Sequence, residues 1–266
     1  MKNTHLIVID PQNDFCLPTG ALSVPGGDKD MERLATMITN NTGRIDSINV
    51  TLDSHHFVHI AHPCWWIDSN GNEPDPFTLI SVDDVTQGKW RAKNPGFQKR
   101  SEDYVKALEA GGRYMLCIWP PHCIIGTTGH AVIDVLNDAL RLWEGQFAIV
   151  NMVTKGSNIF TEHYSAVKAD VQDDEDLVTT GLNTKLIDLL RDTDGDILIA
   201  GQALSHCVAN TVRDIAENFS DEQVKRFVLL EDACSNVTGF EQLGDDFIKE
   251  MTAKGMRLSK TTTYFA

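Results

Sequence analysis

Short apolar runs that alternate with amphipathic helical patterns constrain the fold of this chain most. Runs with the length and composition of buried strands lie at 5–10, 47–52, 146–153, 197–200, 226–230 and 256–259. Apolar residues at helical spacing lie at 28–38, where Asp28 is placed to cap the helix, and at 132–143, 212–219 and 240–254. Such alternation favours a parallel sheet with helices on both faces. We therefore predict an α/β fold with three layers, α/β/α, around a mainly parallel, Rossmann-like six-stranded sheet.

The periodicity weakens between residues 63 and 118, where turn signals surround the aromatic pair Trp65-Trp66 and only 102–109 has a helical pattern. A length of 266 residues suits one α/β domain with an insertion. We predict a single domain over 1–266 with a loop-rich insertion at about 63–118. This segment either packs over the functional site or forms a solvated loop with its own aromatic core.

Charge and cysteine content restrict the classes of function. The chain has 38 acidic and 23 basic side chains, and the resulting net charge of -15 disfavours nucleic acid and anionic membranes as partners. Six irregularly spaced cysteines without a secretory signal predict reduced thiols rather than a disulfide framework. We expect a cytoplasmic protein that acts on a small molecule, and the sequence leaves open whether it forms a homo-oligomer.

A cysteine stands where a buried strand leads into a helix. The apolar run 197–200 is followed by 201–207, which ends at Cys207, and the helical pattern begins directly after it. A thiol at a helix N-terminus can ionise more readily than a free one, which suits a nucleophile. Taken alone, Cys207 fits a small buried helix residue better than a nucleophile, because free cysteine packs as a hydrophobic residue.

Two further polar residues end predicted strands. Asp10 follows the run 5–9, and Lys155 follows the run 146–153. An aspartate there also serves as a turn or cap residue, and a lysine beside a glycine is usually solvated. Because the carboxyl ends of parallel strands share one edge of the sheet, Asp10, Lys155 and Cys207 can meet there. They would supply a base, a cation and a nucleophile for acyl transfer.

The end of the second predicted strand carries a group of metal-competent side chains. They are Asp53, His55, His56, His59 and His62. Asp53 and His55 lie two residues apart on an extended segment and project to the same side, so they can bind one cation. His122 follows two prolines that fix the backbone before it. A surface histidine cluster without a function is the alternative.

Together these motifs resemble the isochorismatase-like cysteine hydrolases, and specifically their nicotinamidase/pyrazinamidase branch. The matching residues, which run in the family's order over nearly the whole chain, are Asp10-Pro11-Gln12-Asn13-Asp14-Phe15, Asp53-Ser54-His55 with His59-Ile60, Trp119-Pro120-Pro121-His122-Cys123 with Gly126-Thr127, Lys155-Gly156, and Gly201 through Thr211.

The resemblance implies roles for individual residues. The general base would be Asp10, its partner Lys155 and the nucleophile Cys207. The metal ligands would be Asp53, His55 and His122, with His59 in the place of a further histidine that some members use. The family has a cis peptide that here would join Gln202 and Ala203 and would aim the N–H groups of Ala203 and Cys207 at the substrate oxygen. Substrate contacts would come from Phe15, Trp119 and Gln202.

The implied activity is a metal-dependent conversion of nicotinamide to nicotinate and ammonia through a thioester, as in NAD salvage. The metal would be one divalent ion, with zinc as the first choice and iron or manganese as alternatives. The same chemistry on another small carboxamide is the alternative substrate assignment, and a metal-binding family member without turnover is the alternative class. The long insertion, Pro11 and His130 depart from the usual pattern and bear on the substrate more than on the triad.

Overall fold

The computed structural model describes residues 3–266 and contains a central sheet of six parallel strands. The strands are β1 (Thr4–Ile9), β2 (Ser47–Asp53), β7 (Asn151–Lys155), β8 (Asp196–Gln202), β9 (Phe227–Ser235) and β10 (Arg257–Ser259), in the order β10-β9-β8-β1-β2-β7. Strands β1 and β8 are buried along their whole length, as expected for a sheet covered on both faces. The predicted α/β class and parallel sheet are confirmed.

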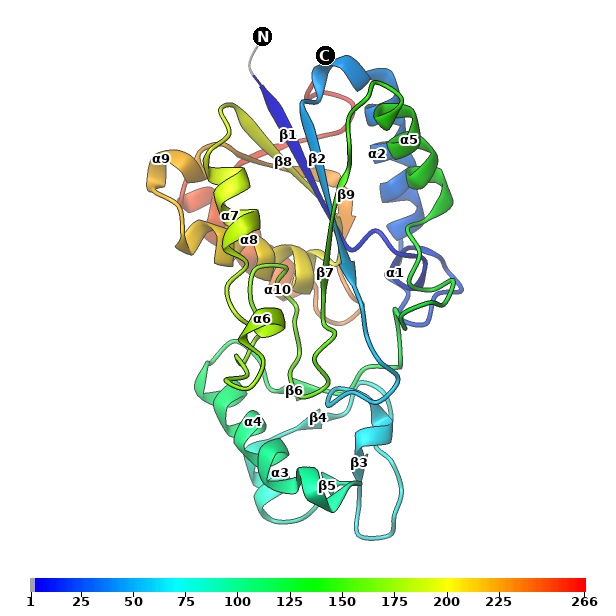
Figure 1. Ribbon diagram of the computed structural model, residues 1–266, viewed down its shortest axis with the longest axis vertical. Coiled ribbons are helices and arrows are strands. Elements are labelled where there is room, and N and C mark those ends of the chain that lie inside the picture. The colour runs from blue at the N-terminus through cyan, green and yellow to red at the C-terminus, as the bar shows by residue number, and fades with distance from the viewer. Residues whose placement is uncertain (1–2) are drawn as a thin grey trace.

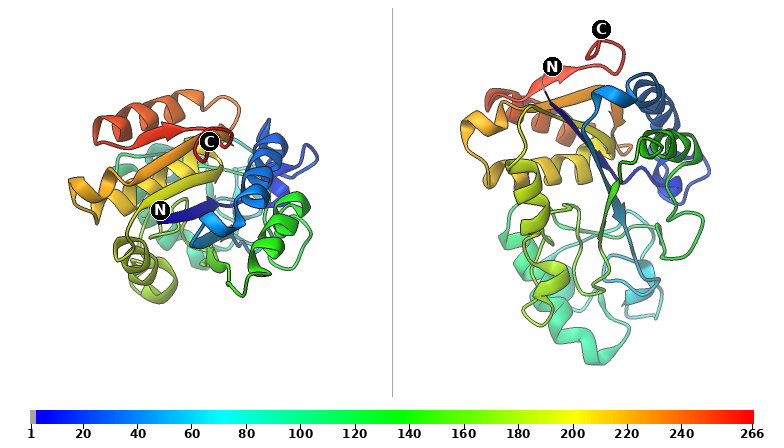
Figure 2. Two further views of the ribbon diagram at one scale, coloured as in Figure 1. Left: turned by 90° about the horizontal axis from the view of Figure 1, so that it is seen from above. Right: turned by 45° about the horizontal axis from the view of Figure 1, so that its top comes forward.

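Helices cover both faces of this sheet (Figures 1 and 2). One face carries α2 (Gly27–Asn40) and α5 (Asp134–Glu144), and the other carries α7 (Thr184–Arg191), α8 (Ala209–Glu217) and α10 (Glu241–Ala253). Shorter helices are α1 (Asn13–Cys16), α6 (Leu177–Thr180) and α9 (Asp221–Val224). Among residues 3–266, no helix is both long enough and apolar enough to cross a membrane.

The order of the strands places a switch point at β1. From β1 the chain continues outward through β2 to β7, and it then returns to β8 on the other side of β1 before it continues to β9 and β10. In parallel sheets, ligands bind beyond the carboxyl ends of the strands at such a point. The ends of β1, β2, β7 and β8 are therefore the part of the fold in which to look for a site.

The segment 63–118 lies beyond those carboxyl ends (Figure 1). It contains the two-stranded pairs β3 (Trp66–Ile67) with β5 (Arg91–Ala92) and β4 (Leu79–Ile80) with β6 (Leu116–Cys117), the helices α3 (Val82–Thr86) and α4 (Gln98–Ala110), and the 3-10 turns η2 (Pro63–Trp65) and η3 (Pro95–Phe97). The segment therefore contains more regular secondary structure than the single helix predicted at 102–109. The extra helix α3 begins with a capping box formed by Ser81 and Asp84.

The paired tryptophans belong to a local aromatic core rather than to a cover over the site. Trp65 stacks on Phe97 with ring centroids 5.1 Å apart and meets Phe160 edge-on at 5.4 Å. Its indole N–H donates to Ser101 Oγ at 2.9 Å, and that of Trp66 donates to the Ile60 carbonyl at 2.7 Å. Phe160 follows Lys155 in the chain, so this core connects the segment 63–118 to the loop after β7.

Three predicted boundaries were wrong. The strand expected at 146–153 begins only at Asn151, because the amides of Gln146 and Phe147 still bond to the last turn of α5. Strand β9 continues through Ser235, beyond the end of the predicted run 226–230. Helix α2 has Gly26 as its N-cap, so Asp28 lies in the first turn, where its charge complements the helix dipole.

Candidate active site

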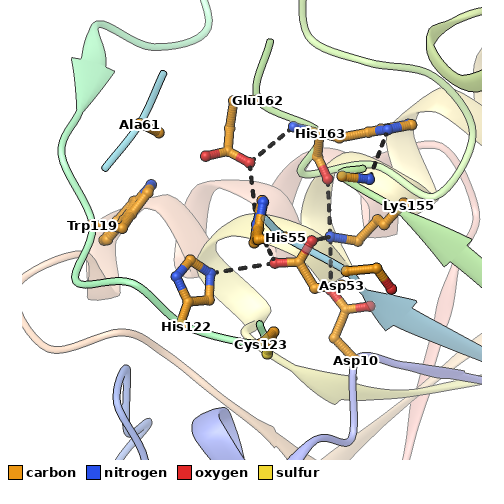
Figure 3. Close-up of polar contacts among 12 residues, drawn as sticks. Asp10, Asp53, His55, Ala61, Trp119, His122, Cys123, Lys155, Glu162 and His163 are labelled. Atoms are coloured by element: carbon orange, nitrogen blue, oxygen red, sulfur yellow. Dashed lines mark hydrogen bonds and ion pairs between the residues drawn. The ribbon is translucent and has the colours of Figure 1, made fainter. Parts of the chain in front are cut away.

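Four chemically competent side chains meet at the carboxyl edge of the sheet, and Figure 3 labels three of them, Asp10, Asp53 and Lys155. Asp10 directly follows β1, Asp53 and Lys155 end the neighbouring strands β2 and β7, and Cys207 lies in the helical turn after β8. All four are buried. The convergence expected from the sequence for Asp10, Lys155 and Cys207 is thus present, and it includes Asp53.

The ammonium group of Lys155 lies at the centre of this set. Its Nζ is 3.0 Å from Asp10 Oδ2 and 3.0 Å from Asp53 Oδ1. It also donates to the His163 carbonyl at 2.9 Å and lies 3.7 Å from Cys207 Sγ. A lysine inside a protein requires such pairing, because an unpaired buried charge is costly. We name Asp10, Lys155 and Cys207 the acid–amine–thiol set.

The protonation of this set follows from burial and its charges. Burial raises the pKa of the Asp10 carboxyl, against the opposing effect of Lys155. Burial alone would lower the pKa of Lys155, but Asp10 and Asp53 hold it well above its ordinary value. Lys155 is therefore an ammonium at neutral pH. Asp10, whose Oδ1 accepts from Thr51 Oγ1 at 2.5 Å, is a carboxylate of increased basicity.

The pKa of the Cys207 thiol is shifted in the direction opposite to the one predicted from the sequence. Strand β8 continues into η4 (Leu204–Val208), a wide helical turn of the π type, before α8 begins. Burial, with smaller contributions from Asp10 and Asp53, raises the pKa of Cys207 well above its ordinary value, although Lys155 opposes the shift. The prediction of an easily ionised thiol was wrong, because the effect of burial exceeds the opposing effect of Lys155. The resting group is a thiol, so it needs a base.

The peptide bond between Gln202 and Ala203 is cis, as the resemblance implied. At the preceding residue, Gly201 has φ of 122°, and a side chain there would place its Cβ 2.0 Å from the Ile9 carbonyl oxygen. Only glycine fits this position between β8 and β1.

Asp53 connects this set to a second cluster. Its Oδ1 faces Lys155, while its Oδ2 lies 3.0 Å from His55 Nε2 and 3.3 Å from His122 Nε2. Burial alone would raise the pKa of Asp53, but His55 and Lys155 hold it well below its ordinary value. Asp53 is therefore an anion that contacts three neighbours, Lys155, His55 and His122.

The side chains of Asp53, His55 and His122 fit a divalent metal. One ligand atom from each lies within 4.8 Å of the others, and all three side chains are buried. Two atoms that each lie about 2.1 Å from zinc at roughly tetrahedral angles are separated by about 3.4 Å, close to the distances from Asp53 Oδ2. The Nδ1 of His122 lies 2.9 Å from the Pro120 carbonyl and donates to it, which leaves Nε2 free as a ligand.

His59 lies outside that group and belongs to another. It forms a second set of three imidazoles with His55 and His62, again with ligand atoms within 4.8 Å of one another. Burial is the main cause that lowers the pKa of His62 to about 3 and that of His59 well below its ordinary value, so both rings are neutral. We name His55, His59, His62 and His122 the imidazole cluster.

The close approach of the loop after β7 depends on Gly156. This residue has φ of 84°, and an added Cβ would lie 2.7 Å from Asp53 Oδ1 and 3.1 Å from His55 Cε1. The glycine that follows Lys155 therefore allows the acid–amine–thiol set and the imidazole cluster to pack against each other.

A small pocket opens onto these residues. Cys207, Asp53 and His122 contribute its polar wall, and its other lining residues are Phe15, Leu22, Trp119, Glu162, Tyr164, Ala203, His206 and Val237. The candidate substrate contacts Phe15 and Trp119 thus reach the pocket. Gln202 does not, because its amide donates to Asp30 Oδ2 at 2.8 Å and accepts from the Ser235 N–H at 3.2 Å. The Gln202 side chain therefore points away from the pocket and connects the turn after β8 to Asp30 and Ser235.

Sequence reasoning missed several pocket residues. Glu162 Oε1 lies 3.9 Å from His55 Nε2, and the Glu162 backbone N–H donates to the hydroxyl of Tyr104 in α4. His206 is enclosed by aromatic rings, including Tyr114, which stacks on it at 5.6 Å. The only signal for Glu162 was its position in the loop that follows Lys155. Nothing in the pattern around Cys207 indicated that His206 faces the pocket.

Comparisons with known proteins agree with this architecture. A nicotinamidase of Saccharomyces cerevisiae is 26% identical over 212 residues, which are 80% of this chain and 81% of that protein. A structure of the yeast nicotinamidase bound to the inhibitor nicotinaldehyde has a TM-score of 0.66 at 22% identity and covers 97% of this chain and 99% of its own. A pyrazinamidase of Pyrococcus horikoshii in complex with zinc has a TM-score of 0.58 at 21% identity, with 97% and 99% covered. No protein-family model matches the chain.

Proposed function

We propose that this chain, a relative of the nicotinamidase/pyrazinamidase branch of the isochorismatase-like cysteine hydrolases, hydrolyses nicotinamide to nicotinate and ammonia. The observation that carries the proposal is the buried acid–amine–thiol set at the edge of a small, largely aromatic pocket. A base, a fixed cation and a thiol next to an apolar pocket suit attack on the amide of a flat aromatic ring.

Acylation begins with Asp10 as the general base. Its carboxylate takes the proton of the Cys207 thiol, and Sγ then forms a bond to the amide carbon while the carbonyl electron pair moves to oxygen. The raised pKa of Asp10 makes this transfer easier, and Lys155, 3.7 Å from Sγ, stabilises the sulfur as it becomes anionic. When the tetrahedral species collapses, its C–N bond breaks, the proton on Asp10 passes to nitrogen, and ammonia leaves a thioester.

In deacylation, Asp10 again accepts a proton, this time from water, and then passes it to Cys207. Asp10, again a carboxylate, takes a proton from water, whose oxygen attacks the thioester carbon. The C–S bond breaks, Cys207 regains the proton from Asp10, and nicotinic acid leaves and ionises in solvent. Lys155 stays an ammonium throughout, because Asp10 and Asp53 hold its pKa well above its ordinary value and Asp53 remains a carboxylate while Asp10 carries the proton. It positions Asp10 rather than exchanging protons.

The backbone N–H groups of Ala203 and Cys207 are the proposed oxyanion hole. Both residues line the pocket, and they flank the turn that follows the cis peptide. Loss of one such donor costs about 3 kcal/mol of barrier in hydrolases of this type. This assignment comes from the resemblance and from the position of the turn.

Asp53, His55 and His122 would hold one divalent ion, with zinc as the first choice. When bound, the ion supplies a Lewis acid that can anchor the pyridine nitrogen of the substrate. Asp53 and Cys207 both line the pocket, so a ring held at the first would present its amide to the second. Dependence of turnover on this ion is part of the proposal.

The test follows ammonia and nicotinate release from nicotinamide by zinc-loaded protein. Wild type and the control Cys117→Ala, which alters a buried thiol outside the site, should release both products, whereas Cys207→Ala should release neither. A peptide that contains Cys207 and carries an acyl group after rapid quenching would support the thioester. Equal release by Cys207→Ala would sink the mechanism. Release from other small carboxamides but not from nicotinamide would replace the substrate, and no release from any amide would favour a binding protein.

A further inference from the structure

We propose that the chain binds a small oxyanion, a carboxylate or a phosphate, in a second cavity formed by the end of β7, the loop that follows it and the start of α7. This cavity has a volume of about 360 Å³, which suits a small molecule. Lys155 is part of its wall, yet none of its described lining residues also lines the pocket beside Cys207. The proposal concerns binding and stands whether or not the chain hydrolyses amides.

The wall of this cavity lacks negative side chains. The chain has 38 acidic and 23 basic side chains, but the described residues that line the cavity include two lysines and no aspartate or glutamate. Lys155 is paired with Asp10 and Asp53. Lys185 is exposed, and within residues 3–266 its ammonium group has no ion pair or hydrogen bond. An anion in the cavity would therefore meet a free cation without repulsion from a neighbouring carboxylate.

The first turn of α7 contributes a free backbone donor to the same wall. Two of the first N–H groups are satisfied, because that of Thr184 donates to the Leu182 carbonyl at 2.8 Å and that of Leu186 donates to Asn183 Oδ1 at 3.1 Å. The N–H of Lys185 has no partner among the described residues, and no carbonyl inside the helix can reach it. Such an N–H lies at the positive end of the helix dipole, where anions bind.

His163 contributes a buried donor that also lacks a partner. Its Nδ1 accepts from the Gly156 N–H at 3.2 Å, and burial, with a smaller effect of Lys155, lowers its pKa to about 3. The ring is therefore neutral with its proton on Nε2. This Nε2 is buried without a hydrogen-bond partner, although His163 is only 6% exposed and lines the cavity. Figure 3 shows the ring extending away from Glu162 and His55. Buried donors are nearly always paired, so this one indicates a ligand that accepts.

The free groups of the wall indicate the kind of ligand. They are the ammonium and N–H of Lys185, the Nε2–H of His163, and the hydroxyls of Ser157 and Thr154, which have no hydrogen bond within the described chain. A metal ion does not suit them, because the lone pair of His163 is already used by Gly156. An oxyanion suits them, since its oxygens accept several hydrogen bonds and its charge pairs with the ammonium.

The test measures binding of inorganic phosphate and of succinate to the zinc-loaded, full-length chain by isothermal titration calorimetry, with sodium chloride used to equalise the ionic strength. Wild type should bind one or both anions, and the anion that binds distinguishes a phosphate site from a carboxylate site. Lys185→Gln should weaken this binding by at least about 10-fold, because it removes a charged donor. The matched control is Lys249→Gln, which alters an exposed lysine of α10 outside the cavity and should bind like wild type.

A second variant and a local readout complete the test. His163→Asn keeps an oxygen that can accept from Gly156 but lacks the Nε2–H, and it should also bind at least about 10-fold more weakly. In nuclear magnetic resonance spectra the backbone amide of Lys185 should shift during the titration, whereas that of Lys249 should not. No binding of either anion, or equal binding by wild type and Lys185→Gln, as expected for anions held only at zinc, would overturn the proposal. If circular dichroism shows that His163→Asn is unfolded, Lys185→Gln and the amide shift decide.

Discussion

Two buried polar clusters lie on either side of Asp53 in this protein and are completed in different ways. In the acid–amine–thiol set the chain supplies both signs of charge, since one ammonium contacts two carboxylates at 3.0 Å each. In the imidazole cluster the chain supplies neutral rings, with unpaired nitrogens on His55 and His62. The first cluster is electrostatically complete as folded, whereas the second is built for a cation that the chain does not provide.

Cys207→Ala should have the largest effect and should separate the two clusters. Removal of the nucleophile should lower the rate of nicotinamide hydrolysis by at least about 10⁴-fold, because no other group can form the thioester. The zinc content should not change, since Cys207 belongs to neither set of metal ligands. Steady-state kinetics and metal analysis of the same preparation check both statements. Loss of zinc together with activity would show that the clusters are coupled.

Lys155→Met should cost about 3–5 kcal/mol of unfolding free energy, because it leaves Asp10 and Asp53 as adjacent buried carboxylates. The control is Lys89→Met, which breaks an exposed pair with Asp84 and should cost at most about 1 kcal/mol. Urea unfolding in the presence of a chelator measures both. Equal losses of unfolding free energy for the two variants would mean that the buried ion pairs of Lys155 contribute no more to stability than an exposed pair.

The sequence predicted the fold and the convergence at the sheet edge, because both follow from local patterns. Apolar runs followed by Asp10, Asp53, Lys155 and Cys207 place these residues at strand ends, and parallel topology brings strand ends together. The structure of the segment 63–118 was harder to predict, because its short strands and the helix α3 have little periodicity. They depend instead on contacts within the segment, such as that of Trp65 with Phe97.

Side-chain surroundings could not be predicted in the same way. The pKa of Cys207 depends on how completely the fold buries the thiol, and a helix terminus gives the opposite expectation. Gln202 lies next to the cis peptide in sequence, yet its side chain turns toward Asp30 on α2. The division of the histidines into two sets also depends on distances across the fold, so His59 could be assigned as an extra ligand but not placed with His62.

Acidification should destabilise the native state through His206, an imidazole that lies outside the imidazole cluster. Burial lowers the pKa of His206 to about 4. The unfolded chain takes up this proton near pH 6.5 and the folded chain only near pH 4, so the native state loses stability as the pH falls through that window. Between pH 7 and pH 4.5 the loss from His206 should be about 2–3 kcal/mol. His206→Gln should reduce the total acid-induced loss by this amount in urea unfolding at the two pH values. An unchanged loss would contradict burial as the cause.

Chelation should have the smallest effect and bears most directly on the comparison. A ligand that binds only the native state stabilises it by RT ln(1 + [L]/Kd), so free zinc at about ten times Kd contributes about 1.4 kcal/mol per ion. Removal of zinc should therefore lower the melting temperature of wild type. It should have little effect on His122→Gln, in which the position made of Asp53, His55 and His122 is broken while the acid–amine–thiol set is intact. Differential scanning calorimetry with and without chelator measures the shift. If wild type melted at the same temperature in both conditions, the unpaired imidazoles would be tolerated without an ion, and the imidazole cluster would be as complete in the folded chain as the set around Lys155.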